Sequence, residues 1–377
     1  MIYFDQAASS FPKPQSVVHA VSEALTEYGA NPGRGGHRLA KKAASIIHET
    51  RAELAGFFGL DFPENVWFYP NATAALNQAL KGFPFTAGDH VIATSFEHNS
   101  VRRPLEYLKR SKGIKVSYIH PDEDWVKAIK VNTKLIVAAH GSNLTGIIMP
   151  VEKIAHSAKQ FEIPFLVDAS QTAGVLPIDM KEMGIDMLAF SGHKGLLGPQ
   201  GTGALLVRDG IKLEPYMHGG TGAHSEDIGQ PEQAPERYES GTLNTPGIAG
   251  LQAGLKEIKK IGLAAIYAHE SELAKHCIRG LKEIEGVSVF GPDSGVERLA
   301  VISFRIDGVD VQETAIVMDQ HYDIAVRAGL HCTPLGHETI GTMDGGTIRV
   351  SFGPYNTMEE VDRFLQAVQE IKYGLGS

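Results

Sequence analysis

The sequence predicts an α/β protein, with a mainly parallel sheet in a large domain and a smaller C-terminal α+β domain. Three observations lead to this prediction. Short apolar runs alternate with helical or turn segments from about residue 65 to about residue 210, helical periodicity begins at about residue 250, and further strand-like runs follow it. Short buried runs separated by helices are typical of parallel strands that are joined by crossover helices.

Four apolar runs form the expected centre of the large-domain sheet: residues 91–93, 135–139, 165–167 and 187–190. A helical segment at residues 151–161 separates two of them, as a right-handed crossover requires. Polar residues follow every run, at positions 97–100, 143, 168–171 and 191–194. Because ligands bind outside the carboxyl ends of parallel strands, we expect these polar groups to surround one site.

The C-terminal part has a different pattern. Apolar residues recur at helical spacing from Leu263 to Leu281 and predict a long amphipathic helix. Strand-like runs follow at residues 287–290, 299–304 and 347–352, with helical patterns at residues 311–320 and 358–372. We therefore predict a large domain at residues 16–249 and a small domain at 250–377, joined by an N-terminal segment, 1–15. Residues 218–235 read as a surface loop.

Composition excludes several classes of protein. The 377 residues carry a formal charge of −9, which argues against nucleic acid or an anionic membrane as the main partner. No apolar stretch approaches the roughly 20 residues of a membrane helix, and residues 1–5 lack the features of a signal peptide. Two cysteines do not make a disulfide framework. We expect a cytoplasmic protein without a metal site.

Lys194 and Asp168 carry the first functional prediction, because each follows a predicted strand. A lysine at a buried strand end can form a Schiff base with a cofactor aldehyde, and a nearby carboxylate can pair with a pyridinium nitrogen. These are two protein groups that enzymes using pyridoxal 5′-phosphate (PLP) require. For Lys194 alone, a solvated surface charge is the alternative.

Four further positions support a cofactor site. Ala72 and Thr73 begin a predicted helix, where free N–H groups and a hydroxyl suit a phosphate, although a plain N-cap is the alternative. His98 could stack on a flat ring or serve as a structural histidine. Gln171 lies on the turn after the strand that ends at residue 167 and could reach the same cofactor.

Cys332 and Arg349 are candidates for acting on a substrate. Glycine and proline place Cys332 in a loop, where Arg327 and two histidines make the surroundings of the thiol electropositive. An incidental loop thiol is the alternative, whereas Cys277 falls on a helical apolar stripe and is predicted to be a core residue. Arg349 interrupts a strand and could bind a carboxylate or simply face solvent.

Taken together, these motifs resemble the class V aminotransferase family of PLP-dependent enzymes, and within it the cysteine desulfurase and selenocysteine lyase group. The similarity is most specific at residues 167–174 and 191–194, and two further signatures match at 237–245 and 327–332. The resemblance implies the PLP-dependent transferase fold, which is aspartate aminotransferase-like, and a homodimer whose active sites are shared between subunits.

The resemblance also assigns roles to residues. Lys194 would bind PLP covalently, Asp168 would pair with the ring nitrogen, His98 would stack on the ring and Gln171 would bind the ring hydroxyl oxygen. The phosphate would be held by Ala72, Thr73, Ser191 and His193, with Thr242 from the second subunit. The substrate side would comprise Asn31, Arg34, His37, Asn143, Arg327 and Arg349, and Cys332 would form a persulfide.

The activity that the resemblance implies is the conversion of L-cysteine to L-alanine, with the sulfur retained on Cys332 and passed to an acceptor that the sequence does not identify. Alternatives are a selenocysteine lyase, an aminotransferase, epimerase or lyase of the same family, or a binding protein that has kept the fold. Gln6, Leu330 and residues 333–337 depart from the sequences of well-known desulfurases.

Overall fold

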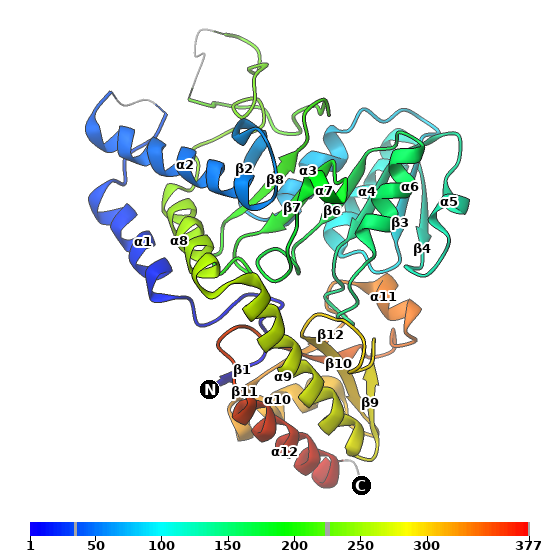
Figure 1. Cartoon of the computed structure of the whole chain (residues 1–377). Coiled ribbons are helices and arrows are strands. Elements are labelled where there is room, and N and C mark those ends of the chain that lie inside the picture. Colours follow the sequence, from blue (N-terminus) through cyan, green and yellow to red (C-terminus); the bar gives the residue numbers. More distant parts are fainter. Residues whose placement is uncertain (34–35, 223–226, 376–377) are drawn as a thin grey trace.

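The computed structural model describes residues 1–33, 36–222 and 227–375, and its centre is a seven-stranded sheet (Figure 1). The strand order is β2-β8-β7-β6-β5-β3-β4. Neighbours from β7 to β4 pair in parallel, and β8 is antiparallel to both of its neighbours. The strands are β2 (Val66–Tyr69), β3 (His90–Thr94), β4 (Lys115–Ile119), β5 (Thr133–Ala139), β6 (Phe165–Asp168), β7 (Met187–Ser191) and β8 (Gly203–Val207). The predicted α/β class and all four predicted strands are confirmed.

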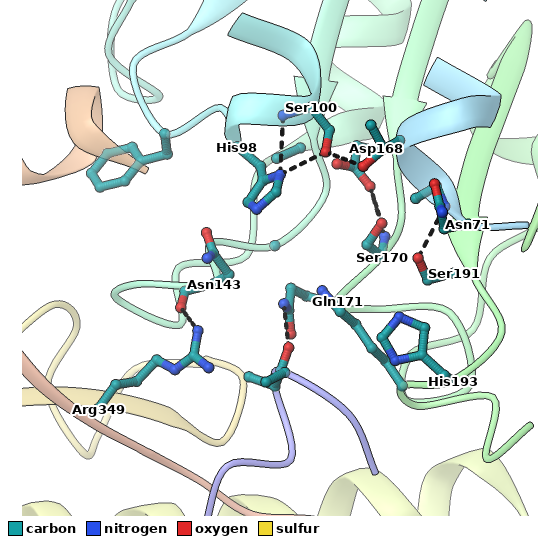
Figure 2. Close-up of a pocket in the computed structure, with 18 of the residues that line it drawn as sticks. Asn71, His98, Ser100, Asn143, Asp168, Ser170, Gln171, Ser191, His193 and Arg349 are labelled. Carbon is teal, nitrogen blue, oxygen red and sulfur yellow. Dashed lines mark hydrogen bonds between the residues drawn. The ribbon is translucent and has the colours of Figure 1, made fainter. Parts of the chain in front are cut away.

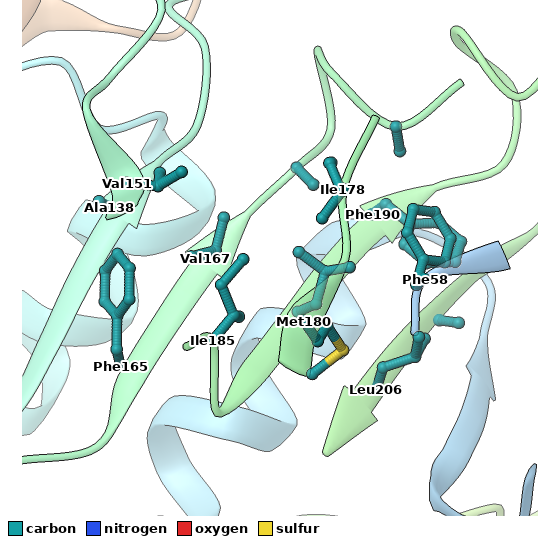
Figure 3. Packing of buried hydrophobic residues seen from close by; sticks show 14 of the residues in the cluster. Phe58, Ala138, Val151, Phe165, Val167, Ile178, Met180, Ile185, Phe190 and Leu206 are labelled. Atoms are coloured by element: carbon teal, nitrogen blue, oxygen red, sulfur yellow. The ribbon is translucent and has the colours of Figure 1, made fainter. Parts of the chain in front are cut away.

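Helices cover both faces of this sheet, which explains why its strands are continuously apolar. Successive side chains of a strand point to opposite faces, and Ile136 and Leu135 accordingly belong to two different buried clusters. On one face lie α3 (Ala72–Gly82) and α4 (Asn99–Lys112); on the other lie α2 (Arg38–Phe57), α6 (Val151–Gln160), α7 (Met180–Met183) and α8 (Thr245–Ile261). Figure 3 shows part of the buried cluster on the face covered by α2, α6, α7 and α8, with Phe165 and Phe190 among its large side chains.

A second, antiparallel sheet of four strands lies in the C-terminal part, in the order β12-β13-β10-β9. Its strands are β9 (Val287–Phe290), β10 (Val301–Ile306), β12 (Arg327–Gly329) and β13 (Thr347–Ser351), and it packs with α9 (Leu263–Glu283), α10 (Val311–Tyr322) and α12 (Met358–Leu375). The predicted helices and strands of this region are confirmed, with small shifts at their ends. Cys277 is fully buried in α9, as its place on the apolar stripe predicted.

The N-terminal segment pairs with the C-terminal part of the chain rather than with the large sheet, forming a separate two-stranded sheet. Strand β1 (Ile2–Tyr3) pairs in parallel with β11 (Ile324–Ala325), and the backbone of Asp5 forms an isolated parallel β-bridge with Ser351 of β13. The chain then enters α1 (Gln15–Glu27), which packs against α8. The predicted boundary after residue 249 falls inside α8, and the division into domains stays a prediction.

Short elements complete the described chain: η1 (Pro63–Asn65), α5 (Trp125–Ala128) and α11 (Pro334–Thr339). The described parts of residues 218–235 contain neither helix nor strand, which agrees with the predicted loop. Within the described ranges, every helix is too short or too polar to cross a bilayer.

A buried ion pair fixes α2 to the segment that leads into α8. The guanidinium of Arg51 donates from Nη1 and Nη2 to the two carboxylate oxygens of Glu239, at 2.8 and 2.9 Å. Glu239 also accepts a hydrogen bond from the backbone N–H of Phe68 in β2, at 2.6 Å. Both charged side chains are buried, so each depends on the other for compensation of its charge.

We therefore expect Arg51→Met to lower the free energy of unfolding by about 3 kcal/mol or more, because it leaves the Glu239 carboxylate buried and unpaired. The measurement is denaturant unfolding of the purified protein. Lys42→Met is the control, since Lys42 pairs with Glu23 at the surface, and loss of an exposed pair costs at most about 1 kcal/mol. Equal effects of the two substitutions would contradict the role given to the buried pair.

Candidate active site

A pocket of about 220 Å³ opens at the carboxyl ends of β3, β5, β6 and β7. Figure 2 shows side chains from these strand ends and from the two sheets facing one central space. Eleven of the predicted site residues line it: Ala72, Thr73, His98, Asn143, Asp168, Gln171, Ser191, His193, Lys194, Arg327 and Arg349. The expectation that polar groups after the four strands would surround one site is confirmed.

Asp168 is the last residue of β6. Lys194 lies in the turn after β7, the strand that pairs in parallel with β6. Oδ1 of Asp168 accepts hydrogen bonds from the backbone N–H and the hydroxyl of Ser170, at 2.9 and 2.5 Å, which fix the carboxylate. Gly174 has φ +85°, and a Cβ there would collide with the carbonyl oxygen of Gly195, the residue after Lys194. A glycine at position 174 is therefore needed for the two turns to approach each other.

The amine of Lys194 has a lowered pKa. Burial is the largest cause, the guanidinium groups of Arg349 and Arg327 lower the pKa further, and the Asp168 carboxylate raises it; the net result is a pKa of about 8. A lysine in solution has a pKa of about 10.4. A substantial fraction of the Nζ amines is therefore neutral near neutral pH, and only the neutral amine is a nucleophile or a base.

His98 is the N-cap of α4, and its orientation is set by Ser100. Nδ1 of the ring accepts from the backbone N–H of Ser100 at 3.1 Å and lies 2.9 Å from its hydroxyl. Burial, and then the charge of Lys194, lower the pKa of His98 to about 4. The ring is therefore neutral at physiological pH, as a stacking partner for a heteroaromatic ring should be.

The start of α3 lines one side of the pocket. Asn71 is the N-cap, accepting from Ala74 at 2.9 Å, and the N–H of Ala72 donates to the Ser191 hydroxyl at 3.0 Å. An eleven-residue helix directs its positive dipole end into this corner. Nδ1 of His193 is buried there without a hydrogen-bond partner among the described residues. This donor set fits a phosphate.

Arg349 is fully buried, so the solvent-facing alternative for this residue is wrong. Its Nη2 donates to Oδ1 of Asp5 at 2.7 Å, and its Nη1 donates to the backbone oxygen of Asn143 at 2.9 Å. Its Nε is buried and has no partner among the described residues. Because an unpaired buried donor is costly, this edge of the guanidinium suits a carboxylate ligand.

Cys332 is not among the residues that line the pocket; it lies in the loop between β12 and α11, and its side chain is exposed. Arg327 lines the pocket, and its Nη2 lies 3.8 Å from Sγ of Cys332. A positive charge that belongs to the pocket is thus also in contact with the thiol. The predicted loop position is confirmed, and Arg327 supplies a positive charge next to the thiol. The two histidines, His331 and His337, do not add to it as predicted, because both are buried and burial lowers the pKa of each ring.

Besides Cys332, three predicted residues within the described ranges do not line this pocket. Asn31 and Thr242 line a separate cavity of about 920 Å³, next to the Arg51–Glu239 pair. His37 is the N-cap of α2, where Nδ1 accepts from Ala40 at 3.3 Å. Arg34 lies outside the described residues.

Sequence reasoning assigns no individual role to three polar side chains of the pocket: Asn71, Ser100 and Ser170. Ser100 and Ser170 belong to the polar segments that were expected to surround the site. Each holds a predicted residue or the element that carries it. Ser100 bonds to His98 and its Oγ lies 2.7 Å from Oγ1 of Thr73, while Ser170 holds Asp168. Their nearness in sequence to strand ends was the available signal.

Comparisons with known proteins agree with this geometry. The model of the family described as aminotransferase class-V matches residues 2–364. A probable cysteine desulfurase of Pyrococcus abyssi is 36% identical over 394 residues, covering 100% of this chain and 96% of that protein. One from Methanothermobacter thermautotrophicus is 34% identical over 387 residues, covering 100% and 95%.

Two solved structures are closely similar. The apo structure of a cysteine desulfurase from Thermococcus onnurineus has a TM-score of 0.93 and 36% sequence identity, covering 99% of this chain and 95% of that one. The cysteine desulfurase CsdA from Escherichia coli has a TM-score of 0.90 and 25% identity, also covering 99% and 95%. The predicted transferase fold is confirmed by these structures, and the chain belongs to the aminotransferase class-V family.

Proposed function

We propose that this chain is a PLP-dependent cysteine desulfurase, which converts L-cysteine to L-alanine and retains the sulfur as a persulfide on Cys332. The observation that carries the proposal is the contact between Arg327 and Cys332. It places a thiol beside the pocket that contains Lys194 and Asp168. Aminotransferases and racemases need the amine and the carboxylate, but sulfur transfer also needs such a thiol. The names of the similar proteins support the same activity.

The pocket fits PLP by the chemistry of its groups. Lys194 supplies the amine for the aldehyde, Asp168 the carboxylate for the ring nitrogen and His98 a neutral ring to lie against the cofactor. The start of α3, with Ser191 and His193, supplies donors for the phosphate, including the unpaired Nδ1 of His193. When bound, PLP takes up the electrons that are released as bonds to the substrate Cα and Cβ change.

The chain's own groups bind the substrate and move its protons. Nε of Arg349, buried and unpaired, would bind the substrate carboxylate. The neutral Nζ of Lys194 would then take the α-proton and return a proton to the product. Its pKa of about 8 suits both tasks, because the amine can be loaded and unloaded near neutral pH.

Sulfur transfer balances without an external oxidant. The Cys332 thiolate attacks the sulfur of the substrate, an S–S bond forms and the Cβ–S bond breaks. The electron pair of the broken bond stays with the carbon, which takes up a proton and becomes the methyl group of alanine. Thiolate and cysteine therefore give a persulfide anion and alanine, with every atom accounted for.

The separate location of Thr242 and Asn31 supports a homodimer. Both line a cavity that is distinct from the pocket within one chain. If two chains share their sites, these residues would complete the pocket of the partner subunit, with Thr242 adding a donor for the phosphate. A protein sulfur acceptor would then approach the exposed Cys332.

Lys194→Ala should lose both the yellow, borohydride-sensitive absorbance of bound PLP and the release of alanine from cysteine.

Cys332→Ala should keep the absorbance but release alanine on the order of a thousandfold more slowly, because its nucleophile is missing. Cys277→Ala is the control for loss of a thiol, since Cys277 is buried in α9 and does not line the pocket. Wild-type desulfuration by Cys332→Ala would overturn the proposed role of that thiol.

The rate at which PLP-free protein captures added PLP should rise with pH through about 8 and then level off. Below that pKa the Lys194 amine is protonated and cannot attack the aldehyde; above it the amine is neutral. The pKa values of His98 and His193, both about 4, keep these rings neutral over this range. Stopped-flow absorbance from about pH 6 to about pH 10 measures the rate. A rate that falls as pH rises would contradict the assignment.

A further inference from the structure

The loop that carries Cys332 has a strained backbone. His331 and Cys332 are consecutive non-glycine residues with φ of +48° and +61°. L-residues rarely adopt this left-handed conformation because Cβ crowds the following carbonyl oxygen. Such a pair persists only where surrounding contacts hold it in place.

The contacts that hold the loop converge on Asn143. Nδ2 of Asn143 donates to the carbonyl oxygen of His331 at 2.7 Å, and Oδ1 accepts from the Thr333 hydroxyl at 2.6 Å. The two bonds grip the loop on either side of Cys332. A third bond runs from the backbone N–H of Asn99, the first residue of α4, to the carbonyl oxygen of Cys332 at 2.8 Å. Asn143, His331 and Thr333 are all buried, so water does not compete for these bonds.

Asn143 also contacts the group that we assign to the substrate carboxylate. Its backbone oxygen accepts from Nη1 of Arg349 at 2.9 Å, and both residues line the pocket. One residue therefore contacts both the guanidinium and the loop that carries the thiol. The carboxylate and the sulfur of a cysteine substrate are separated by only two carbon atoms, so the distance between them varies over a short range that the two protein groups must match.

We infer that Asn143, together with Thr333, is a positioning unit for the Cys332 thiol in sulfur transfer; this rests on the proposed function. A nucleophile must be held about 3–3.5 Å from the atom that it attacks. Without the clamp, the strained loop relaxes and the thiol spends less time in that position. The sulfur-transfer step slows while substrate binding is retained, so kcat falls and KM does not rise.

Thr333→Val tests this inference, because valine keeps the buried shape and removes the hydroxyl that bonds to Asn143. Thr333 does not line the pocket. The expected result is a loss of kcat on the order of tenfold to a hundredfold, with KM for L-cysteine and the absorbance of bound PLP unchanged. Thr333→Ser should restore kcat. Wild-type kcat in Thr333→Val, or a raised KM with unchanged kcat, would overturn the inference.

Hydrogen exchange gives a readout that does not depend on activity. The N–H of Asn99 is protected by the carbonyl of Cys332, so its exchange should accelerate in Thr333→Val, while exchange in β5 stays as in the wild type. Thr342→Val is the matched control. Thr342 is equally buried and its hydroxyl lies 2.7 Å from Nδ1 of His337, a contact that does not involve Asn143. This control should leave both kcat and the exchange of the Asn99 N–H unchanged.

The two readouts separate the failure of each proposal. If the wild-type protein releases no alanine from cysteine but Thr333→Val still accelerates exchange at Asn99, the clamp on the loop stands and the proposed function falls. If the wild-type protein is active and Thr333→Val changes neither kcat nor exchange, the clamp falls and the proposed function stands.

Discussion

The guanidinium of Arg349 is buried where three parts of the chain meet. The side chain belongs to β13 of the C-terminal sheet, its Nη2 contacts Asp5 of the N-terminal segment and its Nη1 contacts the loop after β5. A buried positive charge requires compensation, and these two partners supply it. The same charge lowers the pKa of Lys194. Joining the parts of the fold and tuning the pocket are thus consequences of one interaction.

The pocket combines a rigid frame with a strained edge. Asp168 ends β6 and Lys194 lies in the turn after β7. These two strands pair in parallel in the middle of a sheet that is covered on both faces, which gives both groups a rigid support. Cys332 is carried by a short loop in an unfavourable conformation that a few buried hydrogen bonds maintain. Under the proposed function, the groups that would hold the cofactor gain from this rigidity, whereas the thiol would have to remain exposed to meet a substrate and deliver sulfur.

Electrostatics in the pocket favour neutral bases. Burial lowers the pKa of His98 and of His193, and it lowers the pKa of Lys194 more than Asp168 raises it. Two guanidinium groups, Arg327 and Arg349, also line the pocket. Under the proposed function, the amine would transfer protons and the arginines would recognise negative charge.

Three features could be predicted from the amino-acid sequence: the parallel strands, the polar residues at their carboxyl ends, and the positions of Lys194 and Asp168 after two of these strands. These follow from apolar runs and from the rule that parallel strands deliver their ends to one edge, both of which are local properties of the chain. The resemblance to the class V aminotransferase family then predicted most of the other polar residues that line the pocket. Ser100 and Ser170 belong to the predicted polar segments, but a serine near a strand end has no distinctive pattern that would reveal its individual role.

Three features depend on how the chain packs and could not be predicted from the sequence. They are the burial of Arg349, the hydrogen bonds from Asn143 to the Cys332 loop, and the location of Thr242 and Asn31 in a separate cavity. Asn143 and Arg349 are 206 positions apart, and Asn143 and Thr333 are 190 apart. No periodicity within a strand or helix encodes such pairs, because their contacts arise when the two sheets and the N-terminal segment pack together. The partners of a buried polar group are chosen by that packing.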